Sequence, residues 1–177
     1  VRQAKRLVGD APFAVLLPDD VIMHEAGALA QMVDAHRTQG GHMVATMDVP
    51  RNAVSSYGVL DVSRQNGRIA HARGLVEKPR PEVAPSTQAI VGRYILEPSI
   101  FERLDALGPG AGGELQLTDA INADVLTAGV TGYQFDGERF DCGSVQGFVQ
   151  ATAAFAMARG DLSADFFAFM EARKSHS

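Results

Sequence analysis

The sequence predicts an α/β fold in which a mixed β-sheet is flanked by helices. Residues 13–17 form a continuous apolar run, typical of a strand buried on both faces of a largely parallel sheet. An amphipathic helical pattern over residues 25–39 and a second strand pattern over residues 44–49 follow, which together indicate a crossover unit. Asn66-Gly67 is a strong hairpin signal, and it adds antiparallel strands to this unit.

Proline, glycine and polar residues mark the ends of the remaining predicted strands and helices. Thr118 is expected to cap the helix that it opens. Residues 108–113 contain four glycines but no following Gly-Lys-Ser/Thr, so they are not a Walker loop. The further expected strands are 59–63, 69–77, 88–96 and 130–135, the expected helices are 2–8, 98–107, 117–126, 146–158 and 161–174, and residues 51–56 are expected to be a polar loop.

Composition limits the class of protein. The 177 residues are 46% hydrophobic, which suits a single domain, 1–177, that buries about 70% of its unfolded surface. A net charge of −5 with interspersed signs offers no basic stripe for nucleic acid and no polybasic patch for a membrane. The single cysteine, Cys142, excludes an intrachain disulfide and a cysteine metal cluster, and fits a cytoplasmic location.

Two aspartates follow predicted strands. Asp19 comes after the apolar run, and Asp141 lies where a strand passes into a helix. Ligands of open α/β sheets bind outside the carboxyl ends of strands, and two carboxylates there can hold one Mg²⁺. The alternative is that Asp19 forms a turn or cap and that Asp141 interacts with a helix N-terminus.

The pair Glu77-Lys78 stands where a strand runs into Pro79. A proline favours an extended residue before it, and on an extended backbone Glu77 and Lys78 point to opposite faces, so they are not expected to form a simple ion pair. A carboxylate suits sugar hydroxyls and an ammonium suits phosphate, so the pair indicates a sugar phosphate ligand. A solvated charged pair is the alternative.

Two glycines and one helix complete the candidates. Gly58 allows close approach of a ligand, or is an ordinary turn or bulge glycine. Gly92 weakens its strand, so a ligand or a neighbouring backbone is expected to need the space. Phe166, Phe169 and Met170 follow helical spacing, which predicts core or subunit packing.

Six stretches in this order and spacing resemble the bacterial UTP:glucose-1-phosphate uridylyltransferases over nearly the whole chain. They are 16–20, 57–59, 74–79, 91–94, 113–121 and 140–143. The resemblance implies a Rossmann-like nucleotidyltransferase fold, the partners UTP and glucose 1-phosphate, the cofactor Mg²⁺ and a homo-oligomer. By similarity, Asp19 and Asp141 bind the metal, Gly58 and Glu77 the glucose and Lys78 the sugar phosphate, and Asp19 and Lys78 are the catalytic residues.

The family opens with a strand, a Gly-rich loop containing arginine and a loop that reads uracil, and none of these stands before Val1. We therefore expect this chain to be the C-terminal portion of a nucleotidyltransferase domain, with the nucleotide-binding unit missing. One alternative is a glucose-1-phosphate thymidylyltransferase, although Leu-Pro-Asp-Asp and Asp-Cys-Gly-Ser favour UTP. The other is a non-catalytic module that binds a sugar phosphate or assists assembly.

Overall fold

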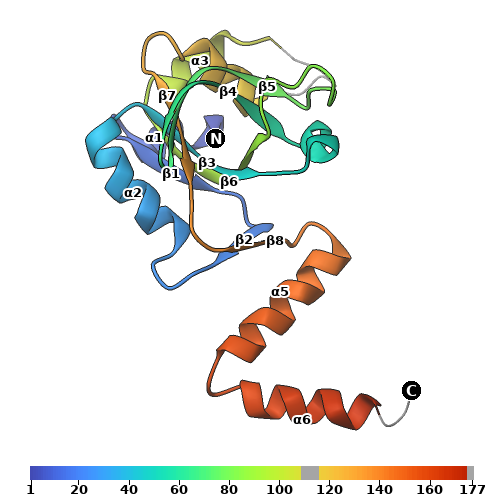
Figure 1. The fold of residues 1–177 in the computed structure, drawn as a ribbon. Helices are drawn as coiled ribbons and strands as arrows, with labels where there is room; N and C mark the ends of the chain where they lie inside the picture. The colour runs from blue at the N-terminus through green and yellow to red at the C-terminus, as the bar shows by residue number, and fades with distance from the viewer. Residues whose placement is uncertain (109–115, 175–177) are drawn as a thin grey trace.

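The computed structural model describes residues 1–108 and 116–174 (Figure 1). Most of the Gly-rich segment 108–113 therefore lies outside the described residues. The strands are β1 (Phe13–Leu16), β2 (Asp20–Met23), β3 (His42–Asp48), β4 (Gly58–Asn66), β5 (Ile69–Glu77), β6 (Gln88–Leu96), β7 (Val130–Gln134) and β8 (Glu138–Asp141). The helices are η1 (Arg2–Ala4), α1 (Lys5–Val8), α2 (Ala28–Gln39), η2 (Arg51–Ser56), α3 (Ile100–Ala106), α4 (Leu117–Ala123), α5 (Val145–Ala158) and α6 (Ser163–Lys174).

The main sheet is mixed, as predicted. Its six strands lie in the order β1-β6-β3-β7-β5-β4, and a separate ribbon pairs β2 with β8. The pair β3–β7 is parallel, whereas the other ladders between described strands are antiparallel. Since β4 also pairs with β6 at Val59 and Ala89, the sheet curls back on itself.

The expectation of a strand at residues 13–17 buried on both faces is wrong. Among the described strands, β1 pairs only with β6, in antiparallel register, and forms an edge of the sheet. Its burial alternates, and Leu16 is 50% exposed, whereas Phe13 stacks on Phe101 with 5.1 Å between ring centroids. The strands of the predicted crossover unit, β1 and β3, thus run in the same direction but flank β6.

Helices cover both faces of the sheet. On one face, α2 packs against Met43, Ala45 and Ile95. On the other, α3 and α4 pack with Val44, Leu60 and Leu96 in the larger hydrophobic cluster. This alternation along β3, Met43 and Ala45 to one side and Val44 to the other, is the period-2 pattern of a strand with two covered faces.

Two connections differ from expectation. Residues 51–56 form the 3₁₀-helix η2 rather than a loop, because Val54 is fully buried against Val59 and Ala84. The hairpin between β4 and β5 uses Gly67-Arg68 as its turn, and Gly67 has a φ of 57°. Asn66 ends β4 instead of entering the turn, so glycine at the first turn position supplies the conformation.

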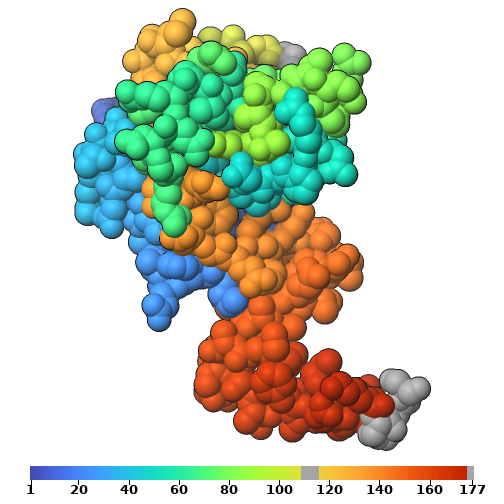
Figure 2. All heavy atoms as spheres, in the orientation of Figure 1, coloured from blue at the N-terminus to red at the C-terminus, as the bar shows by residue number. Residues whose placement is uncertain are grey.

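The last two helices project away from the sheet (Figures 1 and 2). α6 has no buried residue, and Phe169 is 55% exposed, so a role of this helix in the core is wrong. Subunit packing through it stays a prediction. None of the described helices combines the length and apolar character needed to cross a membrane.

Candidate active site

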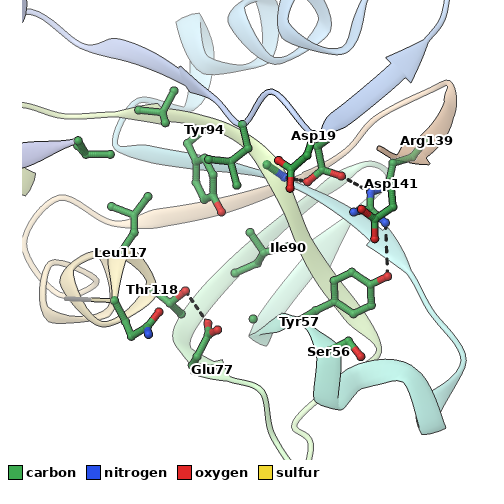
Figure 3. A pocket seen from close by; sticks show the side chains of 17 residues that line it. Asp19, Ser56, Tyr57, Glu77, Ile90, Tyr94, Leu117, Thr118, Arg139 and Asp141 are labelled. Carbon is green, nitrogen blue, oxygen red and sulfur yellow. Dashed lines mark hydrogen bonds and ion pairs between the residues drawn. The ribbon is translucent and has the colours of Figure 1, made fainter. Parts of the chain in front are cut away.

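A pocket of about 470 Å³ opens where the main sheet, the β2–β8 ribbon and α4 meet (Figure 3). Five of the six predicted site residues line it: Asp19, Gly58, Glu77, Gly92 and Asp141. Lys78 follows Glu77 but is not part of the lining. The fold thus brings together residues that are up to 122 positions apart in the sequence, and their individual roles remain predictions.

Asp19 and Asp141 lie at the same end of the pocket. A β-carbon on Gly143 would lie 3.2 Å from Oδ2 of Asp19 and 3.1 Å from Oδ1 of Asp141, so both carboxylates border the same glycine. The backbone N–H of Cys142 donates to the Asp19 carbonyl at 2.7 Å, which ties the two segments together. Asp20 and Asp141 are register partners in the β2–β8 ribbon. Both Asp19 and Asp141 are exposed to the pocket.

This pair fits a divalent cation. Within residues 1–108 and 116–174, neither carboxylate forms an ion pair, and no group of three acidic, His or Cys side chains could hold a metal. Mg²⁺ is usually bound by one or two carboxylates, with substrate phosphates and water completing its shell. Two unpaired carboxylates at the rim of a pocket therefore match its requirements.

Asp20, next to Asp19, has a structural position that the sequence did not reveal. It is buried, and its Oδ2 accepts a 2.7 Å hydrogen bond from the Gly92 N–H. A β-carbon on Gly92 would lie 2.6 Å from Cβ of Leu17 and 2.7 Å from Oδ2 of Asp20. The space that Gly92 leaves is thus filled by two side chains, and not by a neighbouring backbone. Gly92 still lines the pocket, so a ligand contact stays a prediction.

Glu77 lies at the other end of the pocket. Gly58 is its register partner, and a β-carbon on Gly58 would lie 3.1 Å from Oε2 of Glu77. The Thr118 hydroxyl donates to the same oxygen at 2.8 Å. Thr118 is therefore not the cap of α4, whose N-cap residue is Gln116; it sits in the first turn and holds Glu77.

Lys78 does not have the predicted extended conformation. Its φ is 45°, and its N–H donates to the Tyr57 carbonyl at 2.9 Å. This long-range hydrogen bond outweighs the local preference of a residue before proline. The turn also brings Nζ within 3.9 Å of Oε1 of Glu77, so the expectation that the two residues form no ion pair is wrong. The Lys78 side chain is 63% exposed.

Two further pocket residues, Tyr94 and Arg139, were missed. Burial, and then the charges of Asp20 and Glu77, raise the pKa of Tyr94 to about 12. Burial alone would lower the pKa of Arg139, but its hydrogen bond and charge interaction with Asp20 raise it, so the guanidinium stays charged. The signal for Arg139 was its spacing: it lies two residues before Asp141, on the same side of a strand.

The chain is similar to known proteins over most of its length. The family model described as nucleotidyl transferase matches residues 1–157. The chain is 44% identical over 141 residues to a UTP–glucose-1-phosphate uridylyltransferase of Komagataeibacter xylinus, covering 80% of this chain and 50% of that protein. It is 39% identical over 171 residues to one of Staphylococcus epidermidis, covering 97% of this chain and 59% of that protein.

Solved structures of UDP-glucose pyrophosphorylases are similar to this chain in fold. A UDP-glucose pyrophosphorylase complexed with UDP-glucose superposes with a TM-score of 0.83 at 38% identity, covering 89% of this chain and 61% of that one. A UTP-bound UGPase from Acinetobacter baumannii gives 0.84 at 32% identity, covering 96% and 59%. The chain spans between half and three-fifths of the length of these curated relatives. With the family model matching most of its length, the chain belongs to the nucleotidyl transferase family.

Proposed function

We propose that the protein is a UTP:glucose-1-phosphate uridylyltransferase and that this chain supplies the sugar-phosphate and metal part of its active site. The observation that carries the proposal is the pocket itself, which has two unpaired carboxylates, Asp19 and Asp141, at one end and Glu77 with Gly58 at the other. The names of the relatives support UTP over the thymidylyl alternative.

In the proposed reaction, a phosphate oxygen of glucose 1-phosphate attacks the α-phosphorus of UTP. A new P–O bond forms, the bond to the β-phosphate bridge breaks, and pyrophosphate leaves with its electron pair. Two polyanions must meet, so catalysis depends on positioning and on neutralisation of charge. Bound Mg²⁺ would supply such neutralisation and a template for the phosphates.

Each predicted site residue has a place in this reaction. Asp19 and Asp141 hold the cation, with Asp19 as its main ligand. Glu77 accepts hydrogen bonds from glucose hydroxyls, oriented by Thr118. Lys78 follows Glu77 in the chain, and its side chain, which is 63% exposed, can extend from Glu77 toward the sugar phosphate. Gly58 and Gly92 contribute backbone that the ligand can approach.

A cytoplasmic location is inferred from the single cysteine and from the nature of the substrates.

A homo-oligomer is inferred from the apolar side chains on the projecting helices, including Phe148 at 60% and Phe169 at 55% exposure. Light scattering coupled to size exclusion would measure the subunit number. A monomer at micromolar concentration would contradict this inference.

The decisive experiment measures UDP-glucose and pyrophosphate formation by the native protein from glucose 1-phosphate with UTP or dTTP, with and without Mg²⁺. We expect UDP-glucose from UTP, and no product after chelation. Faster turnover with dTTP would identify a thymidylyltransferase. Binding of glucose 1-phosphate without turnover of either nucleotide would identify a non-catalytic module.

A further inference from the structure

Arg139 lies beside Asp19 and Asp141 at the carboxylate end of the pocket, and its side chain extends toward Tyr57 (Figure 3). It comes from β8, and its side chain is only 15% exposed. Its guanidinium forms an ion pair with Oδ1 of Asp20 through Nε, and its Nη1 donates to the Tyr57 hydroxyl at 3.4 Å. The guanidinium carbon also lies 5.6 Å from the centroid of the Tyr57 ring, within cation–π range.

One branch of these contacts leads to the carboxylate pair. Asp20 is the chain neighbour of Asp19 and the register partner of Asp141. Its two oxygens are held by Arg139 and by the Gly92 N–H, so its orientation is fixed from both sides. The pairing offsets the Asp20 charge, whereas neither Asp19 nor Asp141 forms an ion pair among the described residues; the Arg139 charge also acts on Asp141.

The other branch leads to the residues assigned to the sugar phosphate. The Tyr57 carbonyl accepts the Lys78 N–H at 2.9 Å, and Gly58 follows Tyr57 directly. Tyr57 is thus joined to Gly58 by the peptide bond and to Lys78 by the hydrogen bond from the Lys78 N–H. Because Arg139 contacts the Tyr57 ring and hydroxyl, a shift of Arg139 should move Tyr57 and, with it, Gly58 and Lys78.

We propose that Arg139 is a positioning residue that couples the two ends of the pocket, so that a divalent cation and a sugar 1-phosphate bind cooperatively. The inference rests on the proposed function and adds a physical route by which cation binding affects sugar 1-phosphate binding. The route is a chain of direct contacts from Asp20 through Arg139 and Tyr57 to Lys78, which is the kind of contiguous network that carries energetic coupling between sites. Linkage requires that each ligand tighten the other by the same factor.

The test measures the dissociation constant of Mn²⁺ by calorimetry in the native protein, with and without saturating glucose 1-phosphate. We expect the sugar phosphate to tighten Mn²⁺ binding by about fivefold or more, within the range usual for coupled sites. The reciprocal titration should give the same factor. The variants are Arg139→Lys, which keeps the charge but loses the planar fork, and Tyr57→Phe, which loses only the hydroxyl.

The phosphate can itself ligate the ion, so some coupling survives in any variant. The proposal requires the coupling factor in Arg139→Lys to fall at least about threefold below that of the native protein, with a smaller fall in Tyr57→Phe. Arg68→Lys is the matched control, because Arg68 forms an exposed ion pair with Asp136 and should leave the factor unchanged. Near-ultraviolet circular dichroism confirms that each variant is folded.

A smaller fall in Arg139→Lys, or an equal fall in Arg68→Lys, overturns the coupling role while leaving the proposed function intact. A native protein that binds neither Mn²⁺ nor glucose 1-phosphate overturns the proposed function, and the coupling role with it. Should Arg139→Lys fail to fold, the Tyr57→Phe variant decides, because it removes the 3.4 Å hydrogen bond of the route and keeps the buried charge; a coupling factor equal to that of the native protein then overturns the coupling role.

Discussion

The Thr118 hydroxyl donates a 2.8 Å hydrogen bond to Oε2 of Glu77 and so joins the first turn of α4 to the last residue of β5. A second bond between the same elements runs from the Leu75 N–H to Oδ1 of Asn122, at 2.9 Å. α4 is thus attached to β5 at two points. The carboxylate of Glu77 is thereby held in one orientation at the sugar end of the pocket.

Replacement of Thr118 by valine should weaken recognition of glucose. Valine keeps the shape and removes the donor, so Glu77 loses a hydrogen bond to a charged group, worth about 1.5–3 kcal/mol. We expect the ratio of kcat/KM for glucose 1-phosphate to that for its galactose epimer to fall. Thr152→Val is the control, since the Thr152 hydroxyl donates to the Phe148 carbonyl of its own helix. An unchanged ratio would show that Glu77 does not need Thr118.

Replacement of Asp19 by asparagine should abolish Mg²⁺-dependent turnover. The amide keeps the shape and loses the charge that a hard cation requires. The measurement is turnover as a function of Mg²⁺ concentration, with Asp34→Asn on the exposed surface of α2 as the control. Substantial activity with native Mg²⁺ dependence would reject Asp19 as the metal ligand.

Replacement of Lys78 by alanine should lower kcat/KM for every sugar 1-phosphate alike, by about 1.5–3 kcal/mol in activation free energy. Glu77→Gln should instead change the glucose-to-galactose ratio. Lys78→Gly adds a separate test, because φ is 45° there. Glycine should raise the free energy of unfolding by about 1 kcal/mol relative to alanine. Unchanged kinetics in Lys78→Ala would identify Lys78 as a solvated surface group.

Asp124 is the buried centre of a polar network outside the pocket. It accepts hydrogen bonds from Nε2 of His42 at 2.9 Å and from Nε of Arg103 at 3.0 Å, and also from the hydroxyls of Ser99 and Thr127. Nδ1 of His42 accepts the Glu97 N–H at 3.1 Å, so Nε2 carries the proton given to Asp124. The network joins β3, α3 and the end of α4.

The Asp124 network should make the fold sensitive to acid. Burial alone would raise the pKa of Asp124, but its four hydrogen bonds, first those from Ser99 and Thr127, lower it well below the usual range. A depressed pKa gives stability that is present above the unfolded value and lost as the pH falls below about 4.

Denaturant unfolding between pH 2 and pH 7 measures this effect. Asp124→Asn should lose about 3 kcal/mol or more at pH 7 and show a shallower decline below about pH 4. Asp34→Asn, at an exposed ion pair with Arg37, is the control. Equal acid slopes for the native protein and Asp124→Asn would contradict the assignment.

Tyr94 should make the fold sensitive to alkali. Its pKa is raised to about 12, so the neutral phenol is favoured in the folded state. The stability is intact below the unfolded pKa of about 10 and is lost as the pH rises toward 12, by about 2–3 kcal/mol. Tyr94→Phe should lack this part of the decline in urea unfolding between pH 9 and 11.5. Tyr133→Phe, on β7, serves as the control, and equal declines in Tyr94→Phe and the native protein would contradict the effect.

The sequence by itself determined the α/β class, most elements and the family. Strand and helix patterns are local, and each records which positions of one segment face a core. The motifs that carry the resemblance are local as well, so the sequence alone singles out Asp19, Gly58, Glu77, Gly92 and Asp141. Their roles, and the single-domain organisation of residues 1–177, stay predictions.

Only the tertiary structure decided which segments meet. An apolar pattern shows that a strand face is covered but does not say by which strand, and so β1 proved to be an antiparallel edge beside β6. The conformation of Lys78 depends on a hydrogen bond to Tyr57, 21 residues away, which local preference cannot encode. The Arg139–Asp20 ion pair joins residues 119 positions apart. Contacts of this kind exist only once the chain has folded, because their free energy comes from groups that the sequence keeps far from one another.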